Sequence, residues 1–159
     1  MIPTPLPRAL VAADAPAIAA LIRSAFAVLP NPVDPPLSAL RETGESIAAI
    51  LAQGGGGAAI EQDGAIVASC IWQEKAGGLY FGRLAVAPSA RKQGHAGRLL
   101  AAAEAEARAR GLPKLLLSTR LALTANRRLF AAHGFAETAY HTHPGYAAPT
   151  FVDMEKPLA

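Results

Sequence analysis

The segment RKQGHAGRLL, which begins at Arg91, combines glycines with cationic side chains in a pattern suited to holding an anion. Gly94 and Gly97 carry no side chain, so a ligand can approach the backbone closely there. Lys92 and Arg98 add positive charge, and the run that follows predicts a helix whose first N–H groups have no intrahelical acceptor. The pattern favours a turn that binds phosphate or pyrophosphate. An ordinary connection between a strand and a helix also fits these residues.

Two alternating histidines mark a second unusual segment, YHTHPGY, residues 140–146. On a strand, His141 and His143 would face the same way, as the first two ligands of a metal site would. No third ligand follows at a recognisable spacing, so no metal is expected. Pro144 and Gly145 predict a turn between two strands.

The elements that must position these segments are predicted from hydrophobic periodicity and turn residues. Asp14 is the expected N-cap of the first helix, and Gly44 disfavours the middle of the second. The glycines at 54–57 lack the Gly-Lys-Ser/Thr ending of a P-loop and predict a flexible connector. Helices are expected over 14–26, 37–53, 95–110 and 124–135, and strands over 7–12, within 58–86, and over 114–119, 137–142 and 149–156.

The order of these elements is β-α-α-β-β-β-α-β-α-β-β. Within 58–86 the turns Asp63-Gly64 and Gly77-Gly78 predict an antiparallel meander of strands. We therefore expect an α/β fold of the α+β type, with a mixed, mostly antiparallel central sheet and flanking helices. No internal repeat or linker divides the sequence, so residues 1–159 are predicted to form a single domain.

Composition excludes several classes of protein. With 52% hydrophobic and 17% charged residues, the sequence is too apolar for wholesale disorder. A single cysteine, Cys70, and the absence of a signal-peptide pattern favour a cytoplasmic location. No apolar run approaches the roughly 18 residues of a membrane span. The net charge of +3 is scattered and only 6% of residues are aromatic, which disfavours nucleic acid and suits an anionic cofactor.

The segment LAVAPSARKQGHAGRLL, residues 84–100, resembles the acyl-CoA signature of the GNAT superfamily of N-acetyltransferases. The pattern Arg/Gln-x-x-Gly-x-Gly/Ala is met at 91–96, and the preceding V-x-P at 86–88. TANRRLFAAHGF, residues 124–135, is similar to the family's later Asn…Leu-Tyr-x-x-x-Gly-Phe helix. The first helix and the order of elements also match, so the resemblance covers nearly the whole chain.

This resemblance implies acetyl-CoA as co-substrate and a V-shaped splay between the strands GRLAV and KLLLST. The loop at 91–97 would hold the CoA pyrophosphate, and main-chain groups of Leu84 and Val86 would pair with the pantetheine. The backbone N–H of Leu84 would have the catalytic role of polarising the thioester carbonyl. The residues implied to bind the cofactor are Leu84, Val86, Arg91, Lys92, Gln93, Gly94, His95, Ala96, Gly97, Asn126 and Phe130.

Two positions depart from the family's pattern. Phe130 stands where many members carry a tyrosine that protonates the departing CoA thiolate, and a phenyl ring cannot donate a proton. Departure as a bare thiolate forgoes only about 2 kcal/mol at neutral pH, so the reaction stays feasible. Tyr80 and Gly82 hold the cleft-facing positions of a strand on which many relatives place a glutamate that acts as base. Glu42 and Glu74 are the remaining acids expected near the cleft, each better explained as a surface charge, and a water chain to solvent is an equal alternative for the proton.

In this family the turn at Pro144-Gly145 borders the acceptor side of the cleft. Tyr140 and Tyr146 are therefore the candidate catalytic acids, although an exposed polar hairpin fits the segment equally well. Trp72 fits either the core or the pocket. The residues predicted for the substrate pocket are Trp72, Tyr80, His141 and His143.

The implied activity is transfer of an acetyl group from acetyl-CoA to a primary amine of a small molecule or peptide by direct attack. The alternative is a noncatalytic acyl-CoA-binding sensor or regulatory module on the same fold, because the tyrosine and the strand glutamate are missing. No nucleic-acid or membrane partner is expected, and a homodimer is left open. Acceptor specificity is expected to depend on loops such as 28–36 and 140–148.

Overall fold

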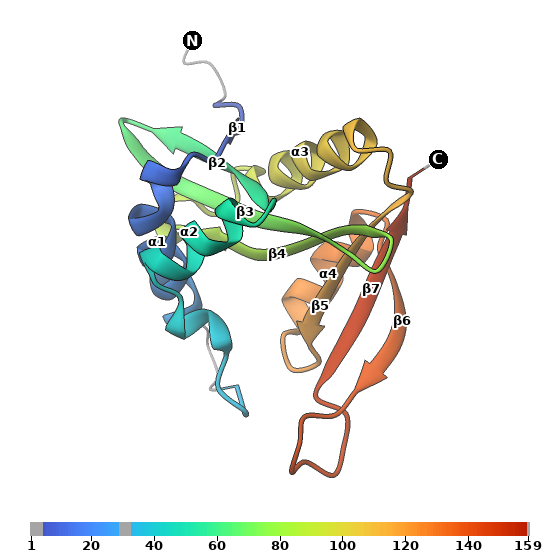
Figure 1. Cartoon of the computed structure of the whole chain (residues 1–159). Coiled ribbons are helices and arrows are strands. Elements are labelled where there is room, and N and C mark those ends of the chain that lie inside the picture. Colours follow the sequence, from blue (N-terminus) through green and yellow to red (C-terminus); the bar gives the residue numbers. More distant parts are fainter. Residues whose placement is uncertain (1–4, 29–32, 159) are drawn as a thin grey trace.

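The computed structural model describes residues 5–28 and 33–158, arranged around a seven-stranded sheet (Figure 1). Residues 29–32 of the predicted proline-rich loop lie outside the described residues. The strand order is β1-β2-β3-β4-β5-β7-β6, and every neighbouring pair is antiparallel except β4 and β5. The predicted mixed, mostly antiparallel sheet is thus confirmed. The strands are β1 (Arg8–Ala9), β2 (Gly56–Gln62), β3 (Ala65–Lys75), β4 (Gly78–Val86), β5 (Lys114–Arg120), β6 (Ala136–His141) and β7 (Phe151–Pro157).

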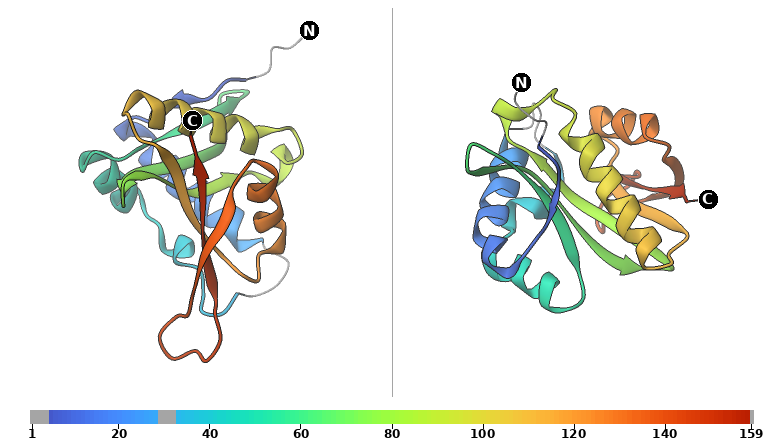
Figure 2. Two further views of the ribbon diagram at one scale, coloured as in Figure 1. Left: turned by 90° about the vertical axis from the view of Figure 1, so that its right-hand side faces the viewer. Right: turned by 90° about the horizontal axis from the view of Figure 1, so that it is seen from above.

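Helices pack on both faces of the sheet, and Figure 2 shows this arrangement from above. On one face lie α1 (Ala15–Ala27) and α2 (Gly44–Ala52), whose apolar side chains join Ile71 and Ala85 of the sheet in one core cluster. On the other face lie α3 (His95–Ala109) and α4 (Thr124–Ala132), which share a second cluster with the sheet. Short 3-10 turns are η1 (Ala12–Asp14), η2 (Ser38–Arg41) and η3 (Pro88–Ala90).

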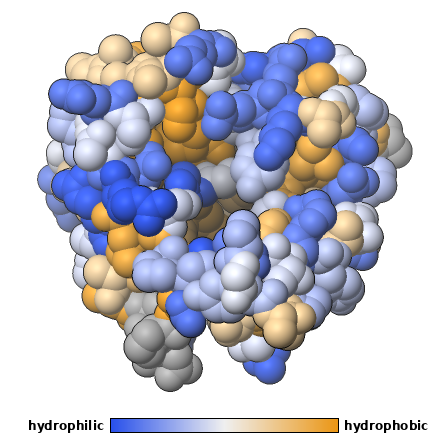
Figure 3. All heavy atoms as spheres, turned by 60° about the horizontal axis from the view of Figure 1, so that its bottom comes forward, coloured by the Kyte–Doolittle hydropathy of each residue, from blue (hydrophilic) through white to orange (hydrophobic). Residues whose placement is uncertain are grey.

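The sheet divides where its two halves meet. β4 and β5 pair only at Leu79↔Leu115 and Tyr80↔Leu116, and beyond these pairs the strands diverge. No helix within the described residues covers the α1 side of β5, β7 and β6, so the V between the two halves stays open there (Figure 1). The surface in Figure 3 is hollowed at this place.

The predicted second helix is interrupted, as Gly44 suggested. η2 ends at Arg41, and α2 begins at Gly44, with Thr43 as its N-cap. Thr43 Oγ1 accepts a hydrogen bond from the Ser46 N–H at 3.1 Å, and Ser46 Oγ accepts one from the Thr43 N–H at 2.9 Å. This reciprocal capping replaces the first turn of a continuous helix.

The glycines at 54–57 are not a flexible connector, contrary to the prediction. Gly56 and Gly57 already belong to β2, and a Cβ atom on Gly57 would lie 2.1 Å from the Cys70 carbonyl oxygen. Gly54 has a φ of 87° and open space around it. At the end of this run, glycine is therefore required by the close packing of the backbones of β2 and β3, and not by a need for mobility.

Gly57→Ala is expected to destabilise the protein by about 2–3 kcal/mol, because β2 must move away from β3 to admit the methyl group. Gly54→Ala introduces backbone strain at a positive φ but no steric overlap, and should lower the unfolding free energy by about 1 kcal/mol. Urea unfolding of both variants tests whether Gly57→Ala is the more destabilising. Equal losses would show that β2 and β3 do not require glycine at residue 57.

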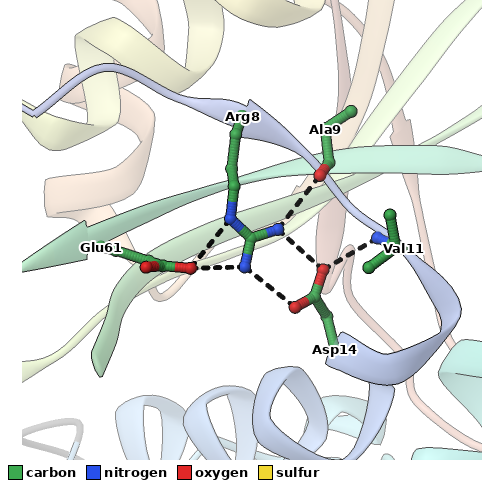
Figure 4. Close-up of polar contacts among 5 residues, drawn as sticks. All are labelled: Arg8, Ala9, Val11, Asp14 and Glu61. Atoms are coloured by element: carbon green, nitrogen blue, oxygen red, sulfur yellow. Dashed lines mark hydrogen bonds and ion pairs between the residues drawn. The ribbon is translucent and has the colours of Figure 1, made fainter. Parts of the chain in front are cut away.

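Asp14 stands at the predicted N-cap position of α1, but its carboxylate makes no capping hydrogen bond to the helix. It accepts hydrogen bonds from the Val11 N–H and from the Arg8 guanidinium, which also reaches Glu61 on β2 (Figure 4). The Arg8 hydrogen bond is the main cause that lowers the pKa of Asp14 below its ordinary value. The network ties the N-terminal strand and η1 to β2.

Arg8→Ala is expected to lower the unfolding free energy near pH 7 by about 0.5–1 kcal/mol, because the pairs are partly exposed. A carboxylate whose pKa is lowered by folding stabilises above its unfolded pKa, about 3.9 for Asp. The difference in unfolding free energy between wild type and Arg8→Ala should therefore shrink as the pH falls below about 4. Arg108→Ala, which breaks an exposed pair on α3, is the control. A difference in unfolding free energy that stays constant from pH 7 to pH 3 would show that Arg8 does not stabilise the protein through ionised Asp14.

Candidate active site

A cleft of about 380 Å³ opens in the V between β4 and β5. Viewed from below in Figure 3, hydrophobic side chains lie deep in the hollow and hydrophilic ones surround it. It is bordered by the α1–α2 connection, by β3 and β4, by β5, by α4 and by the segment before β7. Among its lining residues are Glu42, Tyr80, Gly82, Leu84, Ser118, Arg120, Asn126, Phe130, His143 and Phe151.

A bulge in β4 shapes this cleft. Ile71 of β3 pairs with Gly82 and Ser69 pairs with Ala85, so Arg83 and Leu84 have no partner in the β3–β4 register, which lies wholly within the described residues. Arg83 has a φ of 53°, a left-handed conformation that is costly for a residue with a side chain. Such bulges redirect backbone groups. Here the bulge falls at the diverging end of the V, and Leu84 lines the cleft.

The Arg83 side chain crosses to the α1–α2 connection. Its guanidinium donates to Ser38 Oγ at 2.9 Å and lies 3.4 Å from Glu42 Oε1. Glu42 also accepts from Ser46 Oγ at 3.1 Å. The structure therefore brings Glu42 into the cleft, but as one member of an ion pair.

The predicted anion-binding turn connects η3 to α3. Lys92 and Gly94 both have positive φ, at 62° and 80°, and Gly94 is the N-cap of α3. Arg98 N–H already donates to the Gly94 carbonyl at 3.2 Å, so the free helix-terminal N–H groups are those before it. Arg91, Lys92, Gln93 and Gly94 are exposed. The turn presents backbone donors, the positive end of a helix dipole and cations together.

Arg98 adds an incomplete hydrogen-bond set at this turn. One terminal nitrogen donates to the Gln93 carbonyl at 2.6 Å, and a Cβ on Gly94 would lie 3.2 Å from the other. Its Nε is buried and has no hydrogen-bond partner among the described residues. A buried donor without an acceptor costs about 1–3 kcal/mol. An anion seated on the turn would supply an acceptor, so these residues fit a pyrophosphate.

His95 and Gly97, two of the residues predicted to bind the cofactor, have roles in packing. His95 is 2% exposed and accepts at Nδ1 from Arg98 at 2.9 Å. Burial, and secondarily the Arg98 cation, lower the pKa of His95, so its imidazole is neutral. A Cβ on Gly97 would lie 3.1 Å from the His133 ring, so Gly97 allows the start of α3 to approach the end of α4. The contributions of His95, Ala96 and Gly97 to an anion site are restricted to their backbones.

Asn126 and Phe130 both line the cleft from α4. Phe130 is 5% exposed and packs edge-on against Phe81 at 6.3 Å and Phe135 at 5.8 Å between ring centroids. Its ring is therefore a core side chain that also borders the cleft. Val86, predicted to bind the pantetheine, is the last residue of β4 and lies outside the cleft lining.

The predicted pocket residues separate into two groups. Tyr80 and His143 line the cleft. Trp72 does not: it is 6% exposed and lies in the core cluster beneath α3. His141 stacks on Phe151 at 4.9 Å and pairs with Asp153, but is not among the lining residues.

The two tyrosines predicted as acids are not brought to the cleft. Tyr140 is 57% exposed and donates to Glu137 at 2.7 Å, while Tyr146 donates to Asp34 at 2.6 Å. In each case the hydrogen bond to the carboxylate raises the pKa of the phenol. Hydroxyls held in this way are poor proton donors to a group in the cleft.

Several cleft residues escaped sequence reasoning. Ser118 and Arg120 lie at the end of β5, and Arg120 donates to the carbonyls of Pro35 and Pro36 at 2.6 and 3.3 Å. Phe151 begins β7. Ser118 and Arg120 lie at and just beyond the carboxyl end of the predicted strand KLLLST, which is the signal that could have indicated them. Phe151 lies within the predicted strand 149–156 and carried no such signal.

Within 5–28 and 33–158, no three His, Cys, Asp or Glu side chains gather as a metal ion would require. Over the same residues, no helix has the length and hydrophobicity needed to cross a bilayer.

Comparison with known proteins identifies this arrangement. Residues 20–135 match the model of the acetyltransferase (GNAT) family. The chain belongs to this family. None of the curated proteins matches the sequence.

Solved structures of GNAT N-acetyltransferases share the fold of the chain. A ribosomal-protein-alanine N-acetyltransferase from Brucella melitensis has a TM-score of 0.75 at 21% identity, over 96% of this chain and 99% of that one. An N-acetyltransferase from Staphylococcus aureus has a TM-score of 0.76 at 18% identity, over 98% and 99%. A phosphinothricin acetyltransferase from Sinorhizobium meliloti, solved with acetyl-CoA, has a TM-score of 0.74 at 19% identity, over 98% and 89%. The GNAT-like fold predicted from the sequence is confirmed, and the bound acetyl-CoA agrees with its predicted place as co-substrate.

Proposed function

We propose that this GNAT protein, as one domain over residues 1–159, transfers the acetyl group of acetyl-CoA to a primary amine of a small molecule or peptide by direct attack. The observation that carries the proposal is the bulge at Arg83 and Leu84, placed where β4 leaves β5. It puts the bulged backbone of β4 against the cleft. The acceptor amine would enter from the open side of the V.

The chain's own groups have separate tasks in this proposal. N–H groups at the start of α3, with Arg91, Lys92 and Arg98, hold the pyrophosphate. Asn126 and the Phe130 ring border the pantetheine arm. The Leu84 N–H donates to the thioester oxygen as negative charge develops there, which is worth about 2.7–4 kcal/mol in comparable sites.

Direct attack is supported by the state of the one cysteine in the sequence. Cys70 is fully buried, and burial raises the pKa of its thiol to about 12. A thiol in this state is neither accessible nor ionised, so it cannot take up the acetyl group. The acetyl group therefore passes from sulfur to nitrogen without a cysteine intermediate.

The proposal is tested by CoA release from acetyl-CoA with n-butylamine, benzylamine, spermidine, methionine and a short peptide with a free alanine N-terminus. Acceptor-dependent release with at least one amine supports an enzyme. Stabilisation by acetyl-CoA without release with any of them would favour the sensor, for which Phe130 in the place of a tyrosine is the supporting observation.

Phe130→Tyr is expected to change the rate of acetyl transfer by less than about tenfold, because thiolate departure needs no donor. The rate should rise with pH as the acceptor deprotonates, in wild type and variant alike. Steady-state rates across pH 6–10 check this. A gain well above a hundredfold, with a falling limb near the tyrosine pKa of about 10, would show that a missing acid limits the enzyme.

A further inference from the structure

Ser118 lies in the cleft opposite Gly82, the residue of β4 that precedes the bulge. The last pair between β4 and β5 is Tyr80↔Leu116, and two residues further along each strand lie Gly82 and Ser118. Both line the cleft. Because strand residues two apart point to the same face, Ser118 lies across the V from Gly82 and two residues short of the level of Leu84.

The Ser118 hydroxyl is the first member of a hydrogen-bonded chain that leads out of the cleft. It donates to Asp153 Oδ1 at 2.7 Å, across the β5–β7 pair in which these residues are direct partners. The other carboxylate oxygen lies 2.7 Å from His141 Nε2 on β6. The side chains of His141 and Asp153 are 42% and 39% exposed. The chain thus joins a hydroxyl in the cleft to groups in contact with solvent.

The other acids near the cleft are held differently. Glu42 accepts from the Arg83 guanidinium and from Ser46. Asp34 accepts from Tyr146. Glu74, considered as a base from the sequence, pairs with Arg110 of the α3 end. Among the described carboxylates, Asp153 is the one bonded to a cleft-lining hydroxyl that retains free lone pairs.

We propose that Ser118 and Asp153 form the proton exit of this acetyltransferase, with His141 as a positioning residue for Asp153. The inference rests on the proposed function. Ser118 Oγ accepts a proton from the acceptor nitrogen while its own proton passes to Asp153 Oδ1, and Asp153 releases the proton to water.

The proton balance of the reaction assigns this exit one proton. An ammonium acceptor first loses a proton to solvent, and its nitrogen lone pair then forms the bond to the thioester carbon. The second nitrogen proton leaves through Ser118 and Asp153, the carbonyl re-forms, and the C–S bond breaks with its electrons on sulfur. The CoA thiolate takes a proton from water, so each turnover yields an amide, CoA thiol and one net proton.

Asp153 remains ionised over the working pH range. Burial opposes ionisation, but hydrogen bonds from Ser118 and His141 outweigh it and lower the pKa of the carboxyl. The titratable groups that face it are His141 from β6 and Lys75 from the end of β3, whose ammonium lies over the Tyr80 ring. A carboxylate of low pKa does not store the proton, but it can conduct the proton to water.

The test compares Ser118→Ala, Asp153→Asn and their double variant with Ser118→Thr, which keeps the hydroxyl. Glu155→Gln is the matched control, because Glu155 lies on the same face of β7 but pairs with Lys114. The acceptors are the fastest amine of the panel above and hydroxylamine. Because hydroxylamine is weakly basic, its nitrogen is acidic enough after attack to give its second proton directly to water, without the exit. Acetyl-CoA affinity is measured for every variant.

We expect kcat with the basic amine to fall about a hundredfold in Ser118→Ala, in Asp153→Asn and in the double variant, with no added loss in the double. Ser118→Thr and Glu155→Gln should stay within about threefold of wild type, as should every variant with hydroxylamine. Equal losses with both acceptors, losses that add, or rates near wild type would overturn the exit. Wild type that binds acetyl-CoA but acetylates no amine would instead overturn the proposed function and the exit with it.

Discussion

Gly94→Asp is expected to abolish acetyl-CoA binding while costing the free protein about 1 kcal/mol or less. Gly94 has a φ of 80° and precedes the first residue of α3. A carboxylate there places negative charge against the pyrophosphate and lies beside the Arg98 guanidinium, 3.2 Å from the Cβ position. Both effects remove positive potential from the turn, and the new side chain blocks the approach to its amides.

Gly111→Asp is the matched control for this variant. Gly111 has a φ of 70° and open space around it, at the opposite end of α3. It introduces the same charge and similar backbone strain away from the turn. Calorimetric titration should show wild-type affinity for Gly111→Asp and no heat of binding for Gly94→Asp. Wild-type affinity in Gly94→Asp would mean that the turn does not hold the pyrophosphate.

Replacement of the Leu84 amide by an ester is expected to lower kcat by about 10²–10³-fold, the usual loss of one oxyanion donor. The ester, introduced as the hydroxy-acid analogue of leucine, deletes only the N–H and keeps the side chain. Leu84 lies in the bulge and has no direct Cα partner in the β3–β4 register, which lies within the described residues. Acetyl-CoA affinity should stay unchanged, since the donor acts on charge that develops during transfer.

An ester at Ala85, which pairs with Ser69 in the β3–β4 register, serves as the comparison. It removes a neighbouring N–H of the same strand and should reduce stability rather than kcat. If the Leu84 ester keeps its kcat within about threefold, another group stabilises the oxyanion.

Local patterns predicted most of the fold. The helix at α3 and the meander from β2 to β4 depend on periodicity and turn glycines that lie within a few residues of each other. The turn before α3 was predictable for the same reason, because its conformation depends on neighbouring residues such as Gly94, which has a positive φ. That Asn126 and Phe130 both line the cleft was predictable because residues four apart lie on the same face of a helix.

Contacts between distant segments were not predictable in this way. Ser118 and Asp153 are separated by 35 residues and meet only because β7 inserts between β5 and β6. Periodicity also gives only the relative faces of a strand, which is why Trp72 fitted both the core and the pocket until α3 was placed over it. The burial of His95 likewise depends on Arg98 and on Gln62 from β2.

A single turnover with acetyl-CoA labelled in its acetyl group distinguishes direct transfer to an amine from transfer through the protein. Excess protein, labelled acetyl-CoA and the acceptor amine are mixed and quenched, and mass spectrometry follows the label on amine and protein. We predict that the label appears on the amine in step with CoA release and never on the protein. Label on the protein, or label recovered as free acetate with the amine unmodified, would rule out direct transfer.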